Sequence, residues 1–260
     1  MSESTVRTDL VLFERRGPIA VLTINRPERR NSFDRDTAYA MESAIDRFEA
    51  EDELRVAVIT GAGGVFCAGQ DLLAAARGEL GTTQRRGGGG LMKTPPAKPL
   101  IAAVEGYAVG GGLELCLACD LLVASRTAKM GMPEVKHGAL AMGGGLFRLP
   151  RRVPYAAAME MALTGASWPA ERLSELGLVN RLAEPDSALD VALELAEEIA
   201  AAGPVAVTAS KAIIRESNAW SDTESWDRQD SHVTQVLHSQ DYREGVTAFG
   251  EKRAPVWKGR

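Results

Sequence analysis

The sequence predicts an α/β fold, in which a core of strands and helices is followed by a helical C-terminal part. Three short apolar runs, residues 55–60, 99–105 and 120–125, have the continuous apolar character of strands buried on both faces of a parallel or mixed sheet. From about Tyr155 the spacing of apolar residues becomes helical. The composition, 45% hydrophobic and 25% charged, is that of an ordinary globular protein.

The N-terminal elements are expected to be a strand pair and a helix. Residues 10–15 and 18–25 are rich in Val, Ile and Leu, and Arg16-Gly17 between them is typical of a turn. Pro27 closes the second strand because proline cannot donate a ladder hydrogen bond. In residues 34–49 apolar side chains recur at three- and four-residue spacing, which predicts an amphipathic helix.

Two glycine clusters each follow a predicted strand. In the first, Gly61–Gly64, Phe66 occupies the last glycine position of the dinucleotide fingerprint G-x-G-x-x-G, so a glycine turn explains the cluster better. The second, residues 110–112, lies where a loop enters a helix. The first N–H groups of a helix lack intrahelical partners, and a ligand can approach a backbone without Cβ atoms closely. This cluster is a candidate oxyanion site, with a tightly packed turn as the alternative.

The rest of the chain contains one irregular segment and a series of helices. Residues 78–98 include four consecutive glycines and two prolines, and we expect a mobile loop there. Asp186 is suited to cap a helix that ends at Ala202. Three further helices are expected, over residues 205–216, 223–238 and 241–252. We divide the chain into a core, residues 1–200, and a C-terminal helical region, residues 201–260.

Charge and composition argue against several classes of function. Thirty Lys and Arg against 35 Asp and Glu give a net charge of −5, so no basic excess exists to neutralise nucleic acid. No apolar run approaches the ~20 residues of a membrane-spanning helix. Cys67, Cys116 and Cys119 form no disulfide framework, which favours a reducing cytoplasm. No second cysteine pair follows Cys116 and Cys119, and their neighbours Leu115, Leu117 and Ala118 are apolar, so we expect both cysteines to pack in the core.

Two glutamates lie at positions where acids often have no catalytic role. Glu114 falls in the first turn of the predicted helix, where an acid complements the helix dipole. Glu134 follows the strand-like residues 128–132 and is compatible with a plain surface side chain. His137 nearby receives no role. The chain contains no G-x-S-x-G elbow and no H-E-x-x-H, so the hydrolase and zinc-protease templates find no match.

Taken together, an ordered set of motifs resembles the crotonase, or enoyl-CoA hydratase/isomerase, superfamily over nearly the whole chain. The motifs are Asn25-Arg26-Pro27 with Asn31, Phe66-Cys67-Ala68-Gly69-Gln70-Asp71, residues 106–114, Pro133-Glu134, Leu163-Thr164-Gly165 with Gly177-Leu178-Val179, and the C-terminal Glu244-Gly245, Ala248-Phe249 and Glu251-Lys252-Arg253. The resemblance implies a crotonase-like spiral of ββα units, followed by a C-terminal helical trimerisation region that builds trimers, often paired into hexamers.

The resemblance also implies a catalytic apparatus. Two backbone N–H groups, at Gln70 and Gly111, are expected to stabilise a thioester enolate. Hydratases of this superfamily carry two glutamates 20 positions apart, as Glu114 and Glu134 are here. The earlier one activates water and the later one transfers the proton at the α-carbon, a division of work that suits carboxyls with different pKa values. Isomerases usually keep only one of the two.

The same resemblance suggests where CoA lies. Arg29 and Arg30 are expected to meet its phosphates or adenine, because guanidinium groups suit phosphate; a solvated basic pair is the alternative. No metal and no redox cofactor is expected, since CoA is part of the substrate. Departures at Ala141, Leu146 and Phe147 from the residues common in the superfamily leave the acyl group open. The remaining residues placed at the substrate are Ser32, Ala68, Asp71, Leu72, Tyr107, Gly110 and Pro133.

The sequence therefore predicts an enoyl-CoA hydratase that adds water across the 2,3 double bond. Two alternatives remain: an enoyl-CoA isomerase or related acyl-CoA dehydratase, and a non-catalytic acyl-CoA-binding scaffold. The expected partner is an acyl-CoA thioester, with no nucleic acid and no membrane. The protein is expected to be a cytoplasmic homotrimer or hexamer.

Overall fold

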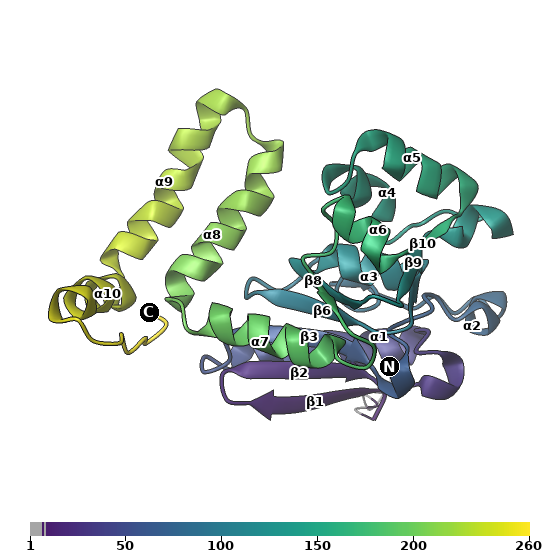
Figure 1. The fold of residues 1–260 in the computed structure, drawn as a ribbon, viewed down its shortest axis with the longest axis horizontal. Coiled ribbons are helices and arrows are strands. Elements are labelled where there is room, and N and C mark those ends of the chain that lie inside the picture. Colours follow the sequence, from purple (N-terminus) through teal and green to yellow (C-terminus); the bar gives the residue numbers. More distant parts are fainter. Residues whose placement is uncertain (1–6, 8) are drawn as a thin grey trace.

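A six-stranded sheet forms the centre of the molecule (Figure 1). The structure is a computed structural model that describes residues 7 and 9–260. The sheet has the order β1-β2-β3-β6-β8-β11, antiparallel between β1 and β2 and parallel elsewhere. Its strands are β1 (Val11–Arg16), β2 (Ile19–Ile24), β3 (Val56–Gly61), β6 (Leu100–Val104), β8 (Leu121–Ser125) and β11 (Arg181–Ala183). The predicted N-terminal strand pair and the three buried strands are confirmed.

Helices cover both faces of this sheet. Val56 and Val58 of β3 face α7 (Ala188–Ala200), while Ala57 and Ile59 between them pack on the opposite side. That side carries α1 (Arg35–Ala50) and α3 (Gly111–Ala118). Burial on both faces explains why the strands are apolar without alternation.

A smaller sheet brings two distant segments to one edge. It contains β10 (Ser167–Pro169), β9 (Lys129–Gly131) and β7 (Tyr107–Val109), and β7 and β9 are parallel. The N–H of Gly110 donates to the carbonyl of Gly131 over 2.9 Å. Because parallel strands end at the same edge, the start of α3 after β7 lies beside the 3₁₀ helix η3 (Pro133–His137) after β9. The helices that follow are α4 (Gly145–Arg148), η4 (Leu149–Arg151), α5 (Tyr155–Thr164) and α6 (Ala170–Glu175).

Residues 78–98 are packed, and the prediction of a mobile loop was wrong. The segment forms a short hairpin, β4 (Thr82–Thr83) with β5 (Gly87–Gly88), against α1. Arg86 is buried and pairs with Asp46 and Glu49 of α1. A Cβ on Gly90 would lie 2.1 Å from the carbonyl oxygen of Ala38. Glycine at this position therefore allows close packing on a helix.

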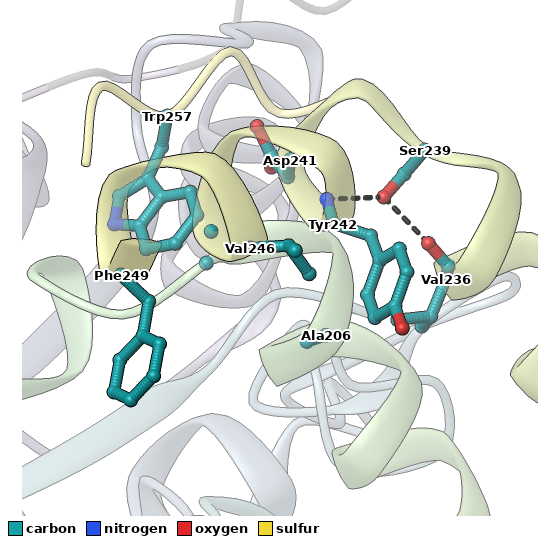
Figure 2. A pocket seen from close by; sticks show the side chains of 10 residues that line it. Ala206, Val236, Ser239, Asp241, Tyr242, Val246, Phe249 and Trp257 are labelled. Carbon is teal, nitrogen blue, oxygen red and sulfur yellow. Dashed lines mark hydrogen bonds between the residues drawn. The ribbon is translucent and has the colours of Figure 1, made fainter. Parts of the chain in front are cut away.

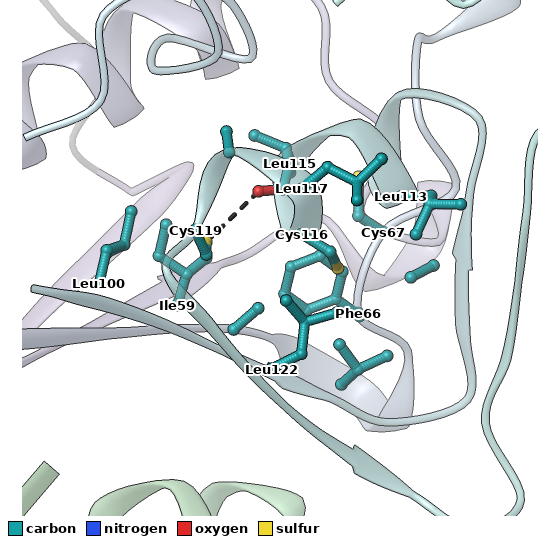
Figure 3. Close-up of a cluster of buried hydrophobic side chains, with 14 of the residues drawn as sticks. Ile59, Phe66, Cys67, Leu100, Leu113, Leu115, Cys116, Leu117, Cys119 and Leu122 are labelled. Carbon is teal, nitrogen blue, oxygen red and sulfur yellow. Dashed lines mark hydrogen bonds between the residues drawn. The ribbon is translucent and has the colours of Figure 1, made fainter. Parts of the chain in front are cut away.

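The other glycine turn and the cysteines behave as predicted. Residues 61–64 form a turn that contains the short η2 (Ala62–Gly64), and the backbone is left-handed at Gly63 and Gly64. Cys67, Cys116 and Cys119 are free and buried among leucines; Cys116 lies on α3, Cys119 caps its C-terminus and Cys67 lies beside it (Figure 3). Burial raises the pKa of the Cys67 and Cys119 thiols to about 12. The cysteines are core residues.

The C-terminal helices extend beyond the sheet (Figure 1). They are α8 (Pro204–Glu216), the short η5 (Ser217–Ala219), α9 (Asp222–His238) and α10 (Gln240–Glu251), and all three predicted helices are confirmed. Lys211 of α8 ties this region to the core through an ion pair with Asp120. The sequence-based division at residues 200/201 stays a prediction, as does trimerisation. Among residues 7 and 9–260, none of the helices combines the length and apolar character that crossing a membrane requires.

Candidate active site

The loop that carries Gln70 lies directly against the start of α3. Gly69, with φ of +87°, leaves no room for a side chain, since a Cβ there would be 2.8 Å from the backbone nitrogen of Gly111. Gly111 is the first residue of α3, so its N–H has no carbonyl partner within the helix. The N–H of Gln70 makes no backbone hydrogen bond within residues 7 and 9–260. Two free backbone donors thus come together, at the positions singled out from the sequence.

Glu114 is held in the first turn of α3, almost fully buried at 4% exposed. Its Oε1 accepts a hydrogen bond of 2.8 Å from the N–H of Gly145. Burial raises the pKa of this carboxyl, and the charge of Glu134 acts in the same direction. The N–H groups of Gly145 and Gly143 oppose the rise because they stabilise the ionised form.

Glu134 lies in the first turn of η3, across from α3. Both of its carboxylate oxygens are buried, and neither has a hydrogen-bond partner in the described part of the chain. A Cβ on Gly110 would be 3.3 Å from Oε1, which places the carboxylate beside the glycine that precedes the Gly111 donor. Burial raises the pKa of Glu134. A buried carboxylate without a partner is costly, and it is the feature expected of a group that meets a ligand.

The two carboxyls therefore differ in environment. The carboxylate of Glu114 accepts a hydrogen bond from the N–H of Gly145, which favours its charged form, whereas the carboxylate oxygens of Glu134 accept no hydrogen bond from the described residues. Environments of this kind separate a base from an acid in one site. The arrangement brings a pair of free N–H donors and two buried carboxyls together around Gly110 and Gly111.

Comparison with known proteins agrees with this geometry. Residues 14–260 match the family model for enoyl-CoA hydratase/isomerase. A carnitinyl-CoA dehydratase from Salmonella typhi is 43% identical over 254 residues, which are 95% of this chain and 97% of the relative. The chain belongs to the enoyl-CoA hydratase/isomerase family.

Solved structures show the same crotonase fold. An enoyl-CoA hydratase from Mycobacterium tuberculosis H37Rv is 52% identical with a TM-score of 0.95, covering 97% of this chain and 100% of that one. A carnitinyl-CoA hydratase from Mycobacterium avium is 40% identical with a TM-score of 0.77, covering 97% of this chain and 99% of that one. The predicted superfamily and fold class are therefore confirmed.

The basic residues expected to bind CoA lie near the loop that carries Gln70. Arg29 ends the exposed η1 (Pro27–Arg29), and Arg30 follows it in a left-handed conformation. Neither guanidinium forms an ion pair with any described residue. The carbonyl of Arg30 accepts a hydrogen bond of 3.0 Å from the N–H of Ala68, which joins the basic turn to the loop that carries Gln70.

The other predicted substrate residues differ in accessibility. Leu72 and Tyr107 are exposed apolar side chains, and Pro133 is half-buried at the start of η3. Ser32 is buried, and its carbonyl accepts a hydrogen bond from Arg26. Contacts of these residues with substrate stay predictions.

Asp71 forms several hydrogen bonds within the protein itself. Its carboxylate caps α2 (Leu72–Ala76), accepting hydrogen bonds of 3.0 and 3.1 Å from the N–H groups of Leu73 and Ala74. It also pairs with Arg26 at 3.2 Å. These bonds outweigh desolvation and lower the pKa of Asp71. The structure therefore gives this carboxylate a role in holding α2 and Arg26, and its contact with substrate stays a prediction.

Gly145 and Arg148 were missed in the sequence as parts of the site. In the sequence, residues 143–148 stand out only by their departure from the pattern common in the superfamily. Its consecutive glycines before a short helix were the one available signal, since glycine allows a backbone to approach a buried side chain closely. No cluster of three or more His, Cys, Asp or Glu suited to a metal ion occurs in the described residues.

A separate apolar pocket of about 380 Å³ lies among the C-terminal helices (Figure 2). Phe249, Val246 and Trp257 line it, together with Val236 and Tyr242. None of the predicted catalytic or substrate residues belongs to it. It is therefore distinct from the candidate active site.

Proposed function

We propose that this protein catalyses the reversible addition of water across the 2,3 double bond of an enoyl-CoA thioester. The observation that carries the proposal is the buried, unpartnered carboxylate of Glu134, placed beside the free N–H donors and within the electrostatic reach of Glu114. Hydration and dehydration are one reaction in two directions. The relatives named as hydratases and as dehydratases therefore support the same chemistry.

The proposed mechanism divides the chemistry between the two glutamates. Glu114, in its ionised form, removes a proton from water as the water oxygen bonds to C3 of the substrate. The double-bond electrons move toward the thioester, and the enolate oxygen is stabilised by the N–H groups of Gln70 and Gly111. Protonated Glu134 then delivers a proton to C2. Glu114 gains one proton and Glu134 loses one, so proton exchange with solvent restores the starting state.

The proposal extends to CoA and to assembly. Arg29 and Arg30 are proposed to contact the phosphates of CoA. Both are exposed cations without an ion-pair partner among the described residues, and they lie near the loop that carries Gln70. A homotrimer or a hexamer is proposed because the C-terminal helices expose large apolar side chains, including Trp226 at 73% and Phe249 at 88%. Apolar surface of this kind is typical of protein interfaces.

The test follows conjugated-thioester absorbance and identifies the product by mass. Hydration of straight-chain enoyl-CoA thioesters should lower the absorbance, and dehydration of carnitinyl-CoA, the reverse direction, should raise it. Glu114→Gln and Glu134→Gln are each expected to lower kcat by about 10²–10⁴-fold. Both should still bind a saturated acyl-CoA. Glu194→Gln, at an exposed position on α7, is the matched control and should match the wild type.

Two results would overturn the proposal. Migration of the double bond without gain of water would identify an isomerase. Tight acyl-CoA binding without turnover of any substrate would identify a scaffold. Among the active substrates, the ratio of kcat/KM values for the straight-chain and carnitinyl thioesters defines the acyl preference.

A further inference from the structure

Arg148 joins two segments that are far apart in the chain. It ends α4, and its guanidinium is half-buried. Nη1 donates to the carbonyl of Gly143 over 2.9 Å, and Nη2 donates to the carbonyl of Met92 over 2.6 Å. Because the guanidinium is rigid and planar, these two hydrogen bonds fix the position and orientation of the two carbonyls relative to each other. Arg148 thus links the packed segment of residues 78–98 to the turn formed by residues 143–145.

That turn is pressed tightly against Glu114. A Cβ on Gly143 would lie 2.2 Å from the sulfur of Met92 and 2.9 Å from Oε2 of Glu114. Gly144 has φ of +101°, and a Cβ there would lie 2.5 Å from Nη1 of Arg148. The absence of side chains lets the turn enter the narrow space between Arg148 and Glu114. The N–H of Gly145 reaches Oε1 of Glu114 in consequence.

We propose that Arg148 is a positioning residue for Glu114, acting through the turn of residues 143–145 without contacting the substrate. The proposal rests on the proposed function, in which Glu114 is the base. With the Gly143 carbonyl held by Nη1, the turn keeps the N–H of Gly145 on Oε1 of Glu114 and so fixes the orientation of the carboxylate toward the attacking water. Backbone donors held in this way need no rearrangement during the reaction.

The charge of Arg148 and the hydrogen bonds from the turn both lower the pKa of Glu114. The groups that face the Glu114 carboxyl are Glu134 from η3, Arg148 from α4 and the N–H groups of the turn. Of these, only Glu134 raises the pKa of Glu114, in addition to burial, while the others lower it. Arg148 itself faces the positive charges of Arg215, Arg152 and Arg151 and the negative charge of Glu114. Loss of Arg148 removes a cation and loosens two donors, so the pKa of Glu114 should rise.

The experiment compares Arg148→Met and Arg148→Lys with Arg151→Met. Arg151 is exposed on η4 and donates no hydrogen bond to the turn, so its variant is the matched control. Arg148→Met is expected to lower kcat by about 100-fold with little change in KM, the loss typical of a misplaced catalytic group. The acid limb of its kcat–pH profile should move to higher pH, because the base must be ionised. Arg148→Lys should recover part of kcat, and Arg151→Met should resemble the wild type.

Two further measurements separate positioning from general destabilisation. In the Glu114→Gln background, Arg148→Met should have no additional effect on kcat. Titration of ¹³C-carboxyl-labelled glutamate, with the Glu114 signal assigned by its loss in Glu114→Gln, should show a higher pKa in Arg148→Met. Circular dichroism establishes that each variant is folded.

The inference is overturned if the pKa of Glu114 in folded Arg148→Met equals that in the wild type. It is also overturned if the loss of kcat caused by Arg148→Met adds fully to the loss caused by Glu114→Gln. The titration needs no turnover, so it tests the inference even if the wild type hydrates no enoyl-CoA. Failure of the proposed function would appear instead as an inactive wild type whose Glu114 pKa still depends on Arg148.

Discussion

Gly111→Pro removes a single backbone donor while keeping the helix that carries it. Gly111 is the first residue of α3, where proline is well tolerated because its missing N–H is not needed by the helix. The substitution therefore deletes one of the two proposed oxyanion donors. Loss of one such donor typically costs ~3–4 kcal/mol of barrier, or about 10²–10³ in kcat. We expect kcat to fall by that factor.

The structure also shows what else the substitution changes. A Cβ at residue 111 would lie 2.6 Å from Cζ and 3.0 Å from Cε1 of the buried Phe33 ring. Overpacking of this kind typically costs ~1–3 kcal/mol of stability. Gly111→Ala introduces the same Cβ and keeps the N–H, so it is the matched control. The difference in kcat between the two variants isolates the hydrogen bond from the steric effect.

The assay follows enoyl-CoA absorbance for wild type, Gly111→Ala and Gly111→Pro, with unfolding curves for each. Saturated acyl-CoA should bind to both variants, since no charge develops on its thioester oxygen. Equal kcat values for folded Gly111→Pro and Gly111→Ala would refute the assignment of the Gly111 N–H as an oxyanion donor.

Three further predictions concern stability and assembly. Burial raises the folded-state pKa of Glu134 above its ordinary 4.5, so the folded protein holds this proton more tightly than the unfolded chain. The resulting stability is fully present below about pH 4.5 and is lost as pH rises through the folded-state pKa, by ~1.4 kcal/mol for each pH unit between the two values. Glu134→Gln should therefore be more stable than wild type at pH 7, and urea unfolding between pH 4 and 8 showing parallel curves would contradict this. Arg86→Met should lower the free energy of unfolding by about 3 kcal/mol, because the Arg86 side chain is only 6% exposed and its ion pairs are buried. Arg85→Met should cost less than about 1 kcal/mol, because the neighbouring Arg85 side chain is 58% exposed. Equal losses in urea unfolding would show that residues 78–98 are not held by Arg86. Phe249→Glu should reduce the mass measured by sedimentation and Leu12→Glu on β1 should not, while an unchanged mass for Phe249→Glu would remove Phe249 from the proposed interface.

Local patterns in the sequence predicted the elements of the fold well. The apolar runs at residues 55–60, 99–105 and 120–125 became central strands, because burial on both faces requires continuous apolar sequence. The three C-terminal helices followed from three- and four-residue spacing in the same way. Cys116 and Cys119 were placed in the core by their leucine neighbours. Each of these features depends on residues close together in the chain.

Glycine was the least predictable residue because it has two opposite uses. The glycines of residues 78–98 were interpreted as mobility, yet they allow close packing on α1. Gly90 lies against Ala38 of α1, and Arg86 of the same segment pairs with Asp46 and Glu49 of that helix. These α1 residues are distant from the segment in the chain, so no local pattern shows the contacts. The ion pair of Asp71 was not predicted for a related reason, since its partner Arg26 belongs to another segment.

The sequence by itself determined the strands, the helices and, through the ordered motifs, the superfamily and the two glutamates 20 positions apart. Only the tertiary structure decided that Glu134 lacks a partner, that Gly145 donates to Glu114, and that Arg148 holds the intervening turn. The physical reason is that the parallel pairing of β7 with β9 and the packing of residues 78–98 on α1 bring these groups together. Burial and hydrogen bonding are properties of that assembly, and no local pattern encodes them.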